Sequence, residues 1–113
     1  MPELVEARVA STSQHYADGI ERVTLDVRLG EAAGLPIPAK GEEQPIDLVL
    51  DSTSYAANLR VAGSYVYVCA DLSDAGGEKV RLADVLFEHG LTTGQRVQLR
   101  VDGSRVHVLR AQG

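Results

Sequence analysis

The chain has 113 residues, a formal net charge of −5 and one cysteine. A chain of this length buries about two-thirds of the surface it exposes when unfolded, so we expect one domain over residues 1–113. One cysteine excludes an internal disulfide, and the negative net charge argues against a generic nucleic-acid binder. The N-terminal segment lacks the basic and apolar regions of a signal peptide, and no apolar stretch approaches membrane-spanning length. We therefore expect a soluble, cytoplasmic protein without a membrane partner.

Alternating apolar and polar residues predict strands along most of the chain. Residues 30–45 contain three Pro and three Gly and form a long connection, which is either a binding loop or a solvated insertion. Residues 55–58 are compatible with a single helical turn. Seven or eight strands at short spacing predict an all-β fold, a small β-barrel with one short helix near residues 82–89. The predicted strands are residues 4–10, 20–29, 46–50, 59–62, 65–72 and 79–81, followed by the two strands of a hairpin.

The strand at residues 65–72 has two candidate orientations. Tyr65, Tyr67 and Cys69 share one face, because successive side chains alternate across a strand. The interpretation we favour buries this face and makes the tyrosines core residues. If Val66 and Val68 face inward instead, the two tyrosines are exposed side by side and become a binding feature. We expect Cys69 to be a buried small apolar residue rather than a nucleophile.

The stretch from residue 79 to residue 110 has the sharpest local signals. Leu82, Val85, Leu86 and His89 recur at helical spacing and predict one helix over residues 82–89. Gly90 followed by an apolar residue is typical of a Schellman motif at a helix C-terminus. No capping side chain precedes the helix.

A hairpin follows, with Asp102-Gly103 as its predicted two-residue turn of type I′. This turn places the apolar residues on one face and puts Arg100 directly opposite Arg105 on the other. Like charges directly opposite disfavour pairing by about 0.2–1 kcal/mol. The arginines therefore splay into water, pair with acids of another strand, or meet an anion. The remaining predicted pairs are Val101 with Ser104, Leu99 with Val106, Gln98 with His107, Val97 with Val108, and Arg96 with Leu109.

The residues that support chemistry are sparse. The three histidines are not at metal-ligand spacing, and neither a phosphate-binding loop nor a catalytic motif is present. We predict no cofactor and do not favour an enzyme. The charge is uneven: residues 1–78 have 5 basic and 13 acidic side chains, net −8, and residues 79–113 have 6 and 3, net +3. Such asymmetry marks a partner surface, or two halves that pair with each other.

A helix that ends in Gly90-Leu91 leads to the turn Gly94-Gln95-Arg96-Val97. This arrangement, over residues 80–109, resembles the B3-like and AbrB-like (swapped-hairpin) DNA-binding pseudobarrels, in which a Gly-Asp-x-Val turn enters a strand. Gln95 departs from that pattern, where Asp is usual. The resemblance implies a pseudobarrel fold and recognition of duplex DNA.

The leading hypothesis is a non-catalytic module that recognises DNA through the basic C-terminal hairpin, where arginine contacts to phosphates supply affinity. An alternative is a protein-interaction or assembly module, in which the acidic part of one copy meets the basic hairpin of another in a homo-oligomer. A third is a small-molecule-binding barrel or an enzyme subunit. DNA binding requires an exposed arginine face free of acidic neighbours. The candidate nucleic-acid or anion contacts are Arg96, Gln98, Arg100, Arg105, His107 and Arg110.

Overall fold

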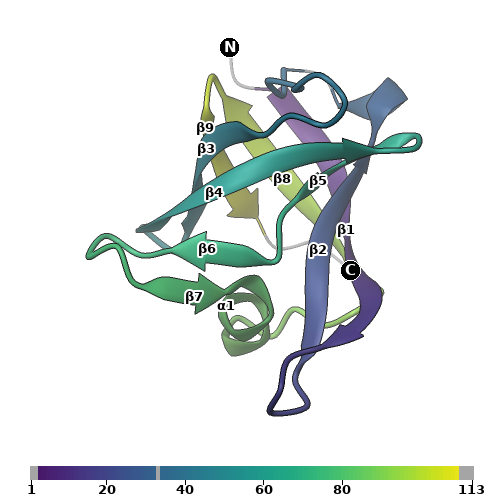
Figure 1. Cartoon of the computed structure of the whole chain (residues 1–113). Coiled ribbons are helices and arrows are strands. Elements are labelled where there is room, and N and C mark those ends of the chain that lie inside the picture. The colour runs from purple at the N-terminus through teal and green to yellow at the C-terminus, as the bar shows by residue number, and fades with distance from the viewer. Residues whose placement is uncertain (1–2, 33, 110–113) are drawn as a thin grey trace.

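The computed structural model describes residues 3–32 and 34–109, and nine strands of this part form one sheet. Figure 1 shows the strands wrapped around a common interior, with the α-helix at one end. The strands are β1 Glu3–His15, β2 Glu21–Arg28, β3 Gln44–Leu50, β4 Thr53–Ala62, β5 Tyr65–Val68, β6 Asp71–Ser73, β7 Lys79–Arg81, β8 Arg96–Asp102 and β9 Arg105–Leu109. The helices are the 3₁₀-helix η1, Leu29–Glu31, and α1, Leu82–Glu88.

Seven strands close a barrel in the order β3-β9-β8-β1-β2-β5-β4, and β4 pairs back with β3. All neighbours are antiparallel except β3 and β9, which run parallel. Strands β6 and β7 extend from β4 outside the ring. The predicted small β-barrel with one short helix is confirmed. The described part has nine strands rather than seven or eight, because the stretch at residues 65–72 divides into β5 and β6.

The barrel interior is filled by the inward residues of each alternating strand. In β8, for example, Val97, Leu99 and Val101 are at most 2% exposed, and the residues between them are exposed. Burial of each such side chain contributes about 1.5–3 kcal/mol. Helix α1 adds Leu82, Val85 and Leu86 to the same cluster. The helix is therefore stabilised by its docking onto the barrel, since seven residues are too few for a stable isolated helix.

The predicted Schellman motif at the end of α1 is confirmed. Gly90 has φ of 75°, its N–H donates to the carbonyl of Phe87 at 3.0 Å, and the N–H of Leu91 donates to that of Leu86 at 2.9 Å. Leu91 is buried, as the motif requires. The side chain of Phe87 lies beside the buried stripe and is 38% exposed.

The register predicted for the C-terminal hairpin is wrong. In the structure Asp102 pairs with Arg105 and Arg100 with His107, so Arg100 does not face Arg105. The loop is Gly103-Ser104, and only Gly103 has a positive φ, 63°. Glycine at the first central position is the pattern of a type II′ turn. Each residue of β8 therefore pairs with a residue of β9 that lies two positions beyond the predicted one. A shift of two residues keeps the same side chains on the apolar face, and it places Asp102 opposite Arg105. The other changed pairs are Val101 with Val106, Leu99 with Val108 and Gln98 with Leu109.

Two further expectations are wrong in the middle of the chain. Residues 55–58 belong to the continuous strand β4 rather than to a helical turn, because Ala57 and Leu59 alternate into the core. Val66 and Val68 are buried, at 0% and 1% exposure, so the tyrosines of β5 lie on the outer face. The interpretation of these tyrosines as core residues is wrong: Tyr65 is exposed and Tyr67 is half-buried. Tyr65 is 39% exposed.

Candidate functional site

The predicted contact residues share the outer face of β8 and β9. Arg96, Gln98, Arg100 and Arg105 are exposed, and His107 is half-buried. The alternation of the two strands explains this placement, because the intervening valines and leucine fill the core. Arg110 lies outside the described residues.

A further arginine joins this face from β1. Arg8 is exposed and lies directly opposite Arg96 in the β1–β8 pairing. Sequence reasoning missed Arg8, since it lies 88 positions from Arg96 and no local pattern reveals which strands become neighbours. We call the exposed Arg8, Arg96, Arg100 and Arg105 the arginine surface.

Acidic side chains compensate part of the arginine surface. Arg96 forms an ion pair with Glu6, 3.4 Å between Nε and Oε1. Arg105 lies opposite two acids, Asp102 in β8 and Asp47 in β3. Exposed pairs of this kind are worth about 0–1 kcal/mol, so a stronger anion can displace them.

Arg8 and Arg100 have no carboxylate within 4.0 Å among the described residues. In the β1–β8 pairing Arg100 lies opposite Leu4, an apolar residue that is 58% exposed. The arginine surface is thus exposed, as a DNA-binding face requires, but it is not free of acidic neighbours.

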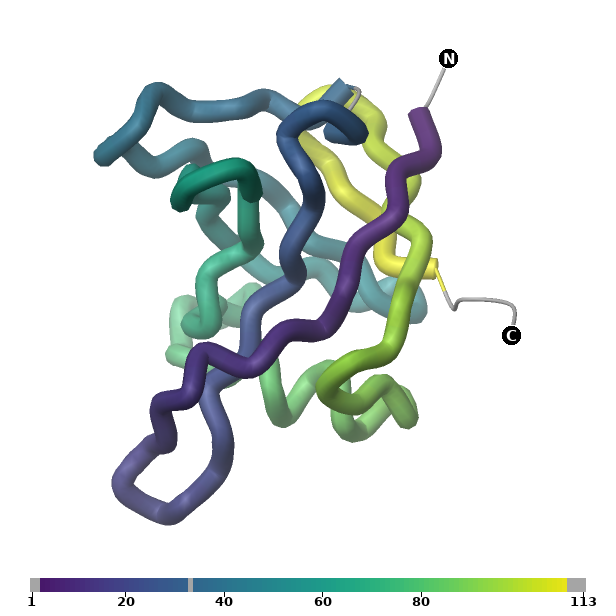
Figure 2. Tube along the Cα trace, turned by 90° about the vertical axis from the view of Figure 1, so that its right-hand side faces the viewer, coloured from purple at the N-terminus to yellow at the C-terminus, as the bar shows by residue number. Residues whose placement is uncertain are grey.

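A groove opens beside the arginine surface where β1 and β2 separate. Their pairing begins at Arg8 with Asp26 and runs toward the β1–β2 turn. Beyond the Arg8–Asp26 pair, in the direction away from the turn, β1 pairs only with β8 and β2 pairs only with β5. Figure 2 shows the two strands diverging toward the N-terminal end of β1. The groove has a volume of about 590 Å³, and Arg8, Arg28, Arg96 and Tyr65 contribute to its lining.

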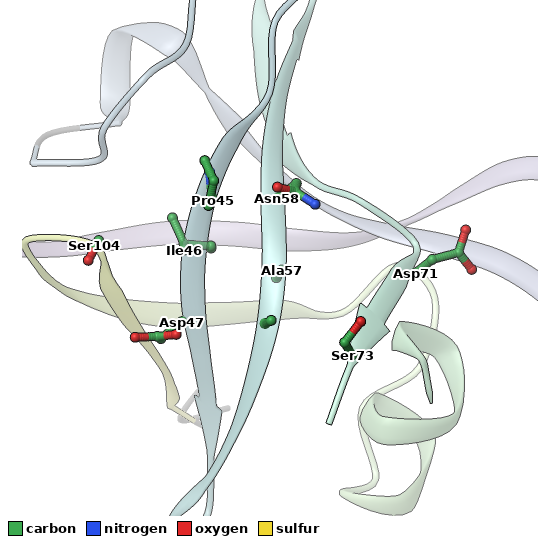
Figure 3. A pocket seen from close by; sticks show the side chains of 9 residues that line it. Pro45, Ile46, Asp47, Ala57, Asn58, Asp71, Ser73 and Ser104 are labelled. Carbon is green, nitrogen blue, oxygen red and sulfur yellow. The ribbon is translucent and has the colours of Figure 1, made fainter. Parts of the chain in front are cut away.

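A second depression lies on another part of the outer surface of the barrel, across β3, β4 and β6 (Figure 3). Its volume is about 340 Å³, and its polar side chains include Asp47, Asn58, Asp71 and Ser73. These groups are acceptors or neutral amides and hydroxyls, without a histidine or cysteine that would serve as base or nucleophile. Its two carboxylates, Asp47 and Asp71, come from β3 and β6, and Asp71 is held by Tyr16 and Arg22.

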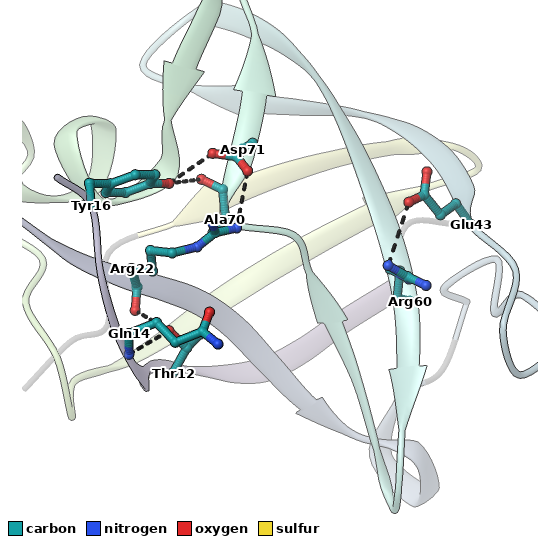
Figure 4. A network of polar contacts seen from close by, with 8 residues as sticks. All are labelled: Thr12, Gln14, Tyr16, Arg22, Glu43, Arg60, Ala70 and Asp71. Carbon is teal, nitrogen blue, oxygen red and sulfur yellow. Dashed lines mark hydrogen bonds and ion pairs between the residues drawn. The ribbon is translucent and has the colours of Figure 1, made fainter.

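A polar network at the β1–β2 hairpin occupies two other arginines, Arg22 and Arg81, and Figure 4 shows the contacts of Arg22 with Asp71 and of Asp71 with Tyr16. The hydroxyl of Tyr16 donates to Asp71 at 2.8 Å, and Arg22 binds the other oxygen of this carboxylate at 3.1 Å. The guanidinium of Arg81 lies 4.0 Å from the centre of the Tyr16 ring and forms a 2.7 Å ion pair with Asp18. Desolvation and the bond to Asp71 raise the pKa of Tyr16 to about 12. This network fastens the hairpin to β6 and β7, so its cations are engaged within the fold.

The described residues offer little for metal or thiol chemistry. Residues 3–32 and 34–109 contain no group of three or more His, Cys, Asp or Glu placed to hold a metal ion. Burial raises the pKa of the Cys69 thiol, which lowers the thiolate fraction that nucleophilic attack requires. Within the same ranges, no helix has the length and apolar character needed to cross a membrane.

A comparison with protein-family models, curated proteins and solved structures finds no match. The fold and the surface therefore define the molecule at the level of its class: a closed mixed β-barrel with an arginine-bearing outer face. The resemblance of residues 80–109 to DNA-binding pseudobarrels stays a prediction from the sequence. Gln95, the departure from that pattern, accepts the N–H of Thr92 at 2.8 Å through its side-chain oxygen.

Proposed function

We propose that this protein is a non-catalytic binding module that binds DNA through phosphate contacts of the arginine surface. The observation that supports the proposal is the placement of Arg8 directly opposite Arg96 on an exposed face that also holds Arg100. Two like charges in one cross-strand pair cost about 0.2–1 kcal/mol, a cost that an anionic ligand removes. Arginine suits this role because its planar guanidinium donates two parallel hydrogen bonds to a phosphate.

The spacing of the arginines favours an extended anion over a single small one. Arg96 and Arg100 are four residues apart along β8, about 13 Å at the rise of a β-strand. Arg8 is about 5 Å from Arg96 across the strands, measured between Cβ atoms. The net charge of −5 opposes binding at long range. Screening limits this repulsion, because the Debye length at physiological salt is about 8 Å.

Fluorescence anisotropy with labelled duplex DNA at several salt concentrations tests the proposal. Each phosphate contact contributes about −0.9 to the slope of log affinity against log salt concentration. We expect the double variant Arg100→Ala/Arg105→Ala to bind more weakly and to lose about 1.8 from the magnitude of this slope. The control is Lys79→Ala, which removes an exposed charge from β7 and should leave the slope unchanged. Absence of binding by the wild type at low salt would overturn the proposal.

Leu4 favours a second candidate function, a protein-interaction or assembly module. This exposed leucine lies beside Arg100, and arginine is enriched at protein interfaces, whose fully buried centres are more apolar than the rest of the surface. If the face joins copies of the chain, the molecular mass from sedimentation equilibrium should rise with concentration, and Leu4→Ser should return it to that of one chain. A concentration-independent monomer in both proteins excludes self-assembly through Leu4.

A further inference from the structure

The groove between β1 and β2 combines three arginines, Arg8, Arg28 and Arg96, with an exposed aromatic ring. Arg28 at the end of β2 lies opposite Tyr65 at the start of β5, and both line the groove that Arg8 borders from β1. Tyr65 is 39% exposed. Strands β1, β2 and β5 thus place a π-face and the guanidinium groups of Arg8 and Arg28 around one hollow.

Three acids also line the groove: Glu6 pairs with Arg96, whereas Asp26 and Glu31 form no ion pair with Arg8 or Arg28 among the described residues. Asp26 lies opposite Arg8 in the strand pairing, but its Oδ1 accepts the hydroxyl of Thr24 at 2.6 Å. No carboxylate of the described ranges lies within 4.0 Å of the Arg8 or Arg28 guanidinium. Both cations are therefore available to a ligand.

The size of the groove indicates what kind of anion it holds. A volume of about 590 Å³ falls within the range of about 300–1,000 Å³ that is usual for organic ligands. This is roomy for a phosphate alone. Its lining joins phosphate-binding side chains to one aromatic ring, the combination that single-stranded nucleic acid requires.

We propose that the groove binds an unpaired nucleotide of a DNA strand, with the base stacked on Tyr65 and the adjoining phosphates on Arg8 and Arg28. The inference rests on the proposed function, because the same strand continues onto the arginine surface through Arg8 and Arg96. A paired base does not fit this role, since its faces are already covered by neighbouring bases in the duplex.

Labelled single-stranded DNA and an abasic strand of equal length test the base contact, because both carry the same phosphates. We expect the wild type to bind the normal strand about 5-fold or more tightly than the abasic strand. Tyr65→Ala should remove this difference, and Tyr65→Phe should keep it because the ring remains. Circular dichroism melting curves verify that each variant is folded.

A tryptophan reporter tests stacking independently of affinity. The chain contains no Trp, so Tyr65→Trp introduces a single emitter into the groove. Stacking should quench its fluorescence when the normal strand is added, whereas the abasic strand should leave the emission unchanged. Equal effects of the two strands would overturn the base contact.

Salt dependence tests the phosphate contacts. For single strands each contact contributes about −0.7 to the log–log slope, so Arg28→Ala should reduce its magnitude by about 0.7, and Lys79→Ala should not. Glu31→Gln should strengthen binding, because it removes a negative charge from the groove lining. One outcome refutes only the proposal that the groove binds an unpaired nucleotide: the protein binds duplex DNA through Arg100 and Arg105 but has equal affinity for the normal and the abasic strand. Failure to bind any DNA refutes both proposals.

Discussion

Replacement of Gly103 by alanine measures how strongly the hairpin turn sets the register of β8 and β9. Gly103 has φ of +63°, and an added Cβ would meet no atom within 4 Å, so the cost is purely conformational. A non-glycine residue held in a sparsely populated region at positive φ costs about 1–3 kcal/mol. The lower entropy of the unfolded alanine chain offsets about 0.4–1 kcal/mol of this cost. The net destabilisation is about 1 kcal/mol, which lowers Tm by about 4 °C in a chain of this size.

Thermal unfolding followed by circular dichroism measures this shift, and Gly30→Ala is the matched control. Gly30 also has open space around its Cβ position, but its φ is not positive. The control should therefore leave Tm unchanged or raise it. If the Tm of Gly103→Ala equals or exceeds that of Gly30→Ala, the reasoning about the turn is wrong.

Asp102 distinguishes the observed register from the predicted one. In a type I′ turn over Asp102-Gly103, Asp102 would need a positive φ, and Asp102→Gly would stabilise the hairpin. In the structure Asp102 is a strand residue opposite Arg105, so Asp102→Gly should destabilise by about 0.5–1 kcal/mol or more. A rise in Tm would favour the predicted register.

Three further predictions concern the core and the polar network. Leu86→Ala, at a side chain with 0% exposure, should cost about 2–5 kcal/mol in urea unfolding, and a loss below 1 kcal/mol would contradict its place in the core. The pKa of Tyr16 is raised from 10.0 to about 12, so its contribution to stability is complete below pH 10 and is lost as the pH rises to about 12; Tyr16→Phe should flatten unfolding free energy across this window. The ion pair with Arg81 lowers the pKa of Asp18, so its contribution is present above the ordinary value of 3.8 and is lost as the pH falls through the lowered value. Asp18→Asn should remove this dependence of the unfolding free energy on acid pH. An unchanged dependence would contradict the role of the Asp18–Arg81 ion pair.

Local patterns were enough to predict the elements near the C-terminus. The periodicity of Leu82, Val85 and Leu86 and the pair Gly90-Leu91 predict a helix and its end, because both signals lie within a few residues. The alternation in β8 and β9 likewise predicts which side chains share the outer face. The loop register failed because Asp102-Gly103 and Gly103-Ser104 are both plausible turns, and both preserve the apolar face.

Features that depend on tertiary pairing were not accessible from the pattern. The orientation of Tyr65 was ambiguous, since both faces of β5 carry residues with high strand propensity. Arg8 joins the candidate site only because β1 pairs with β8, a long-range adjacency that no local signal records, and Arg28 follows because β2 is the hairpin partner of β1. The sequence therefore predicts only the part of the arginine surface that lies on β8 and β9, and it does not predict the groove.

The parallel pairing of β3 with β9 has a consequence for synthesis of the chain. Leu109, the last residue of β9, lies 59 positions after Leu50, the last residue of β3. At about 5–20 residues per second, a ribosome needs about 3–12 s to make this interval. During that time β3 lacks one neighbour and its edge can pair with another nascent chain. The barrel closes only after β9 has been synthesised, and until then intermolecular pairing of β3 competes with folding. Slow translation of residues 51–109 should therefore lower the yield of folded protein.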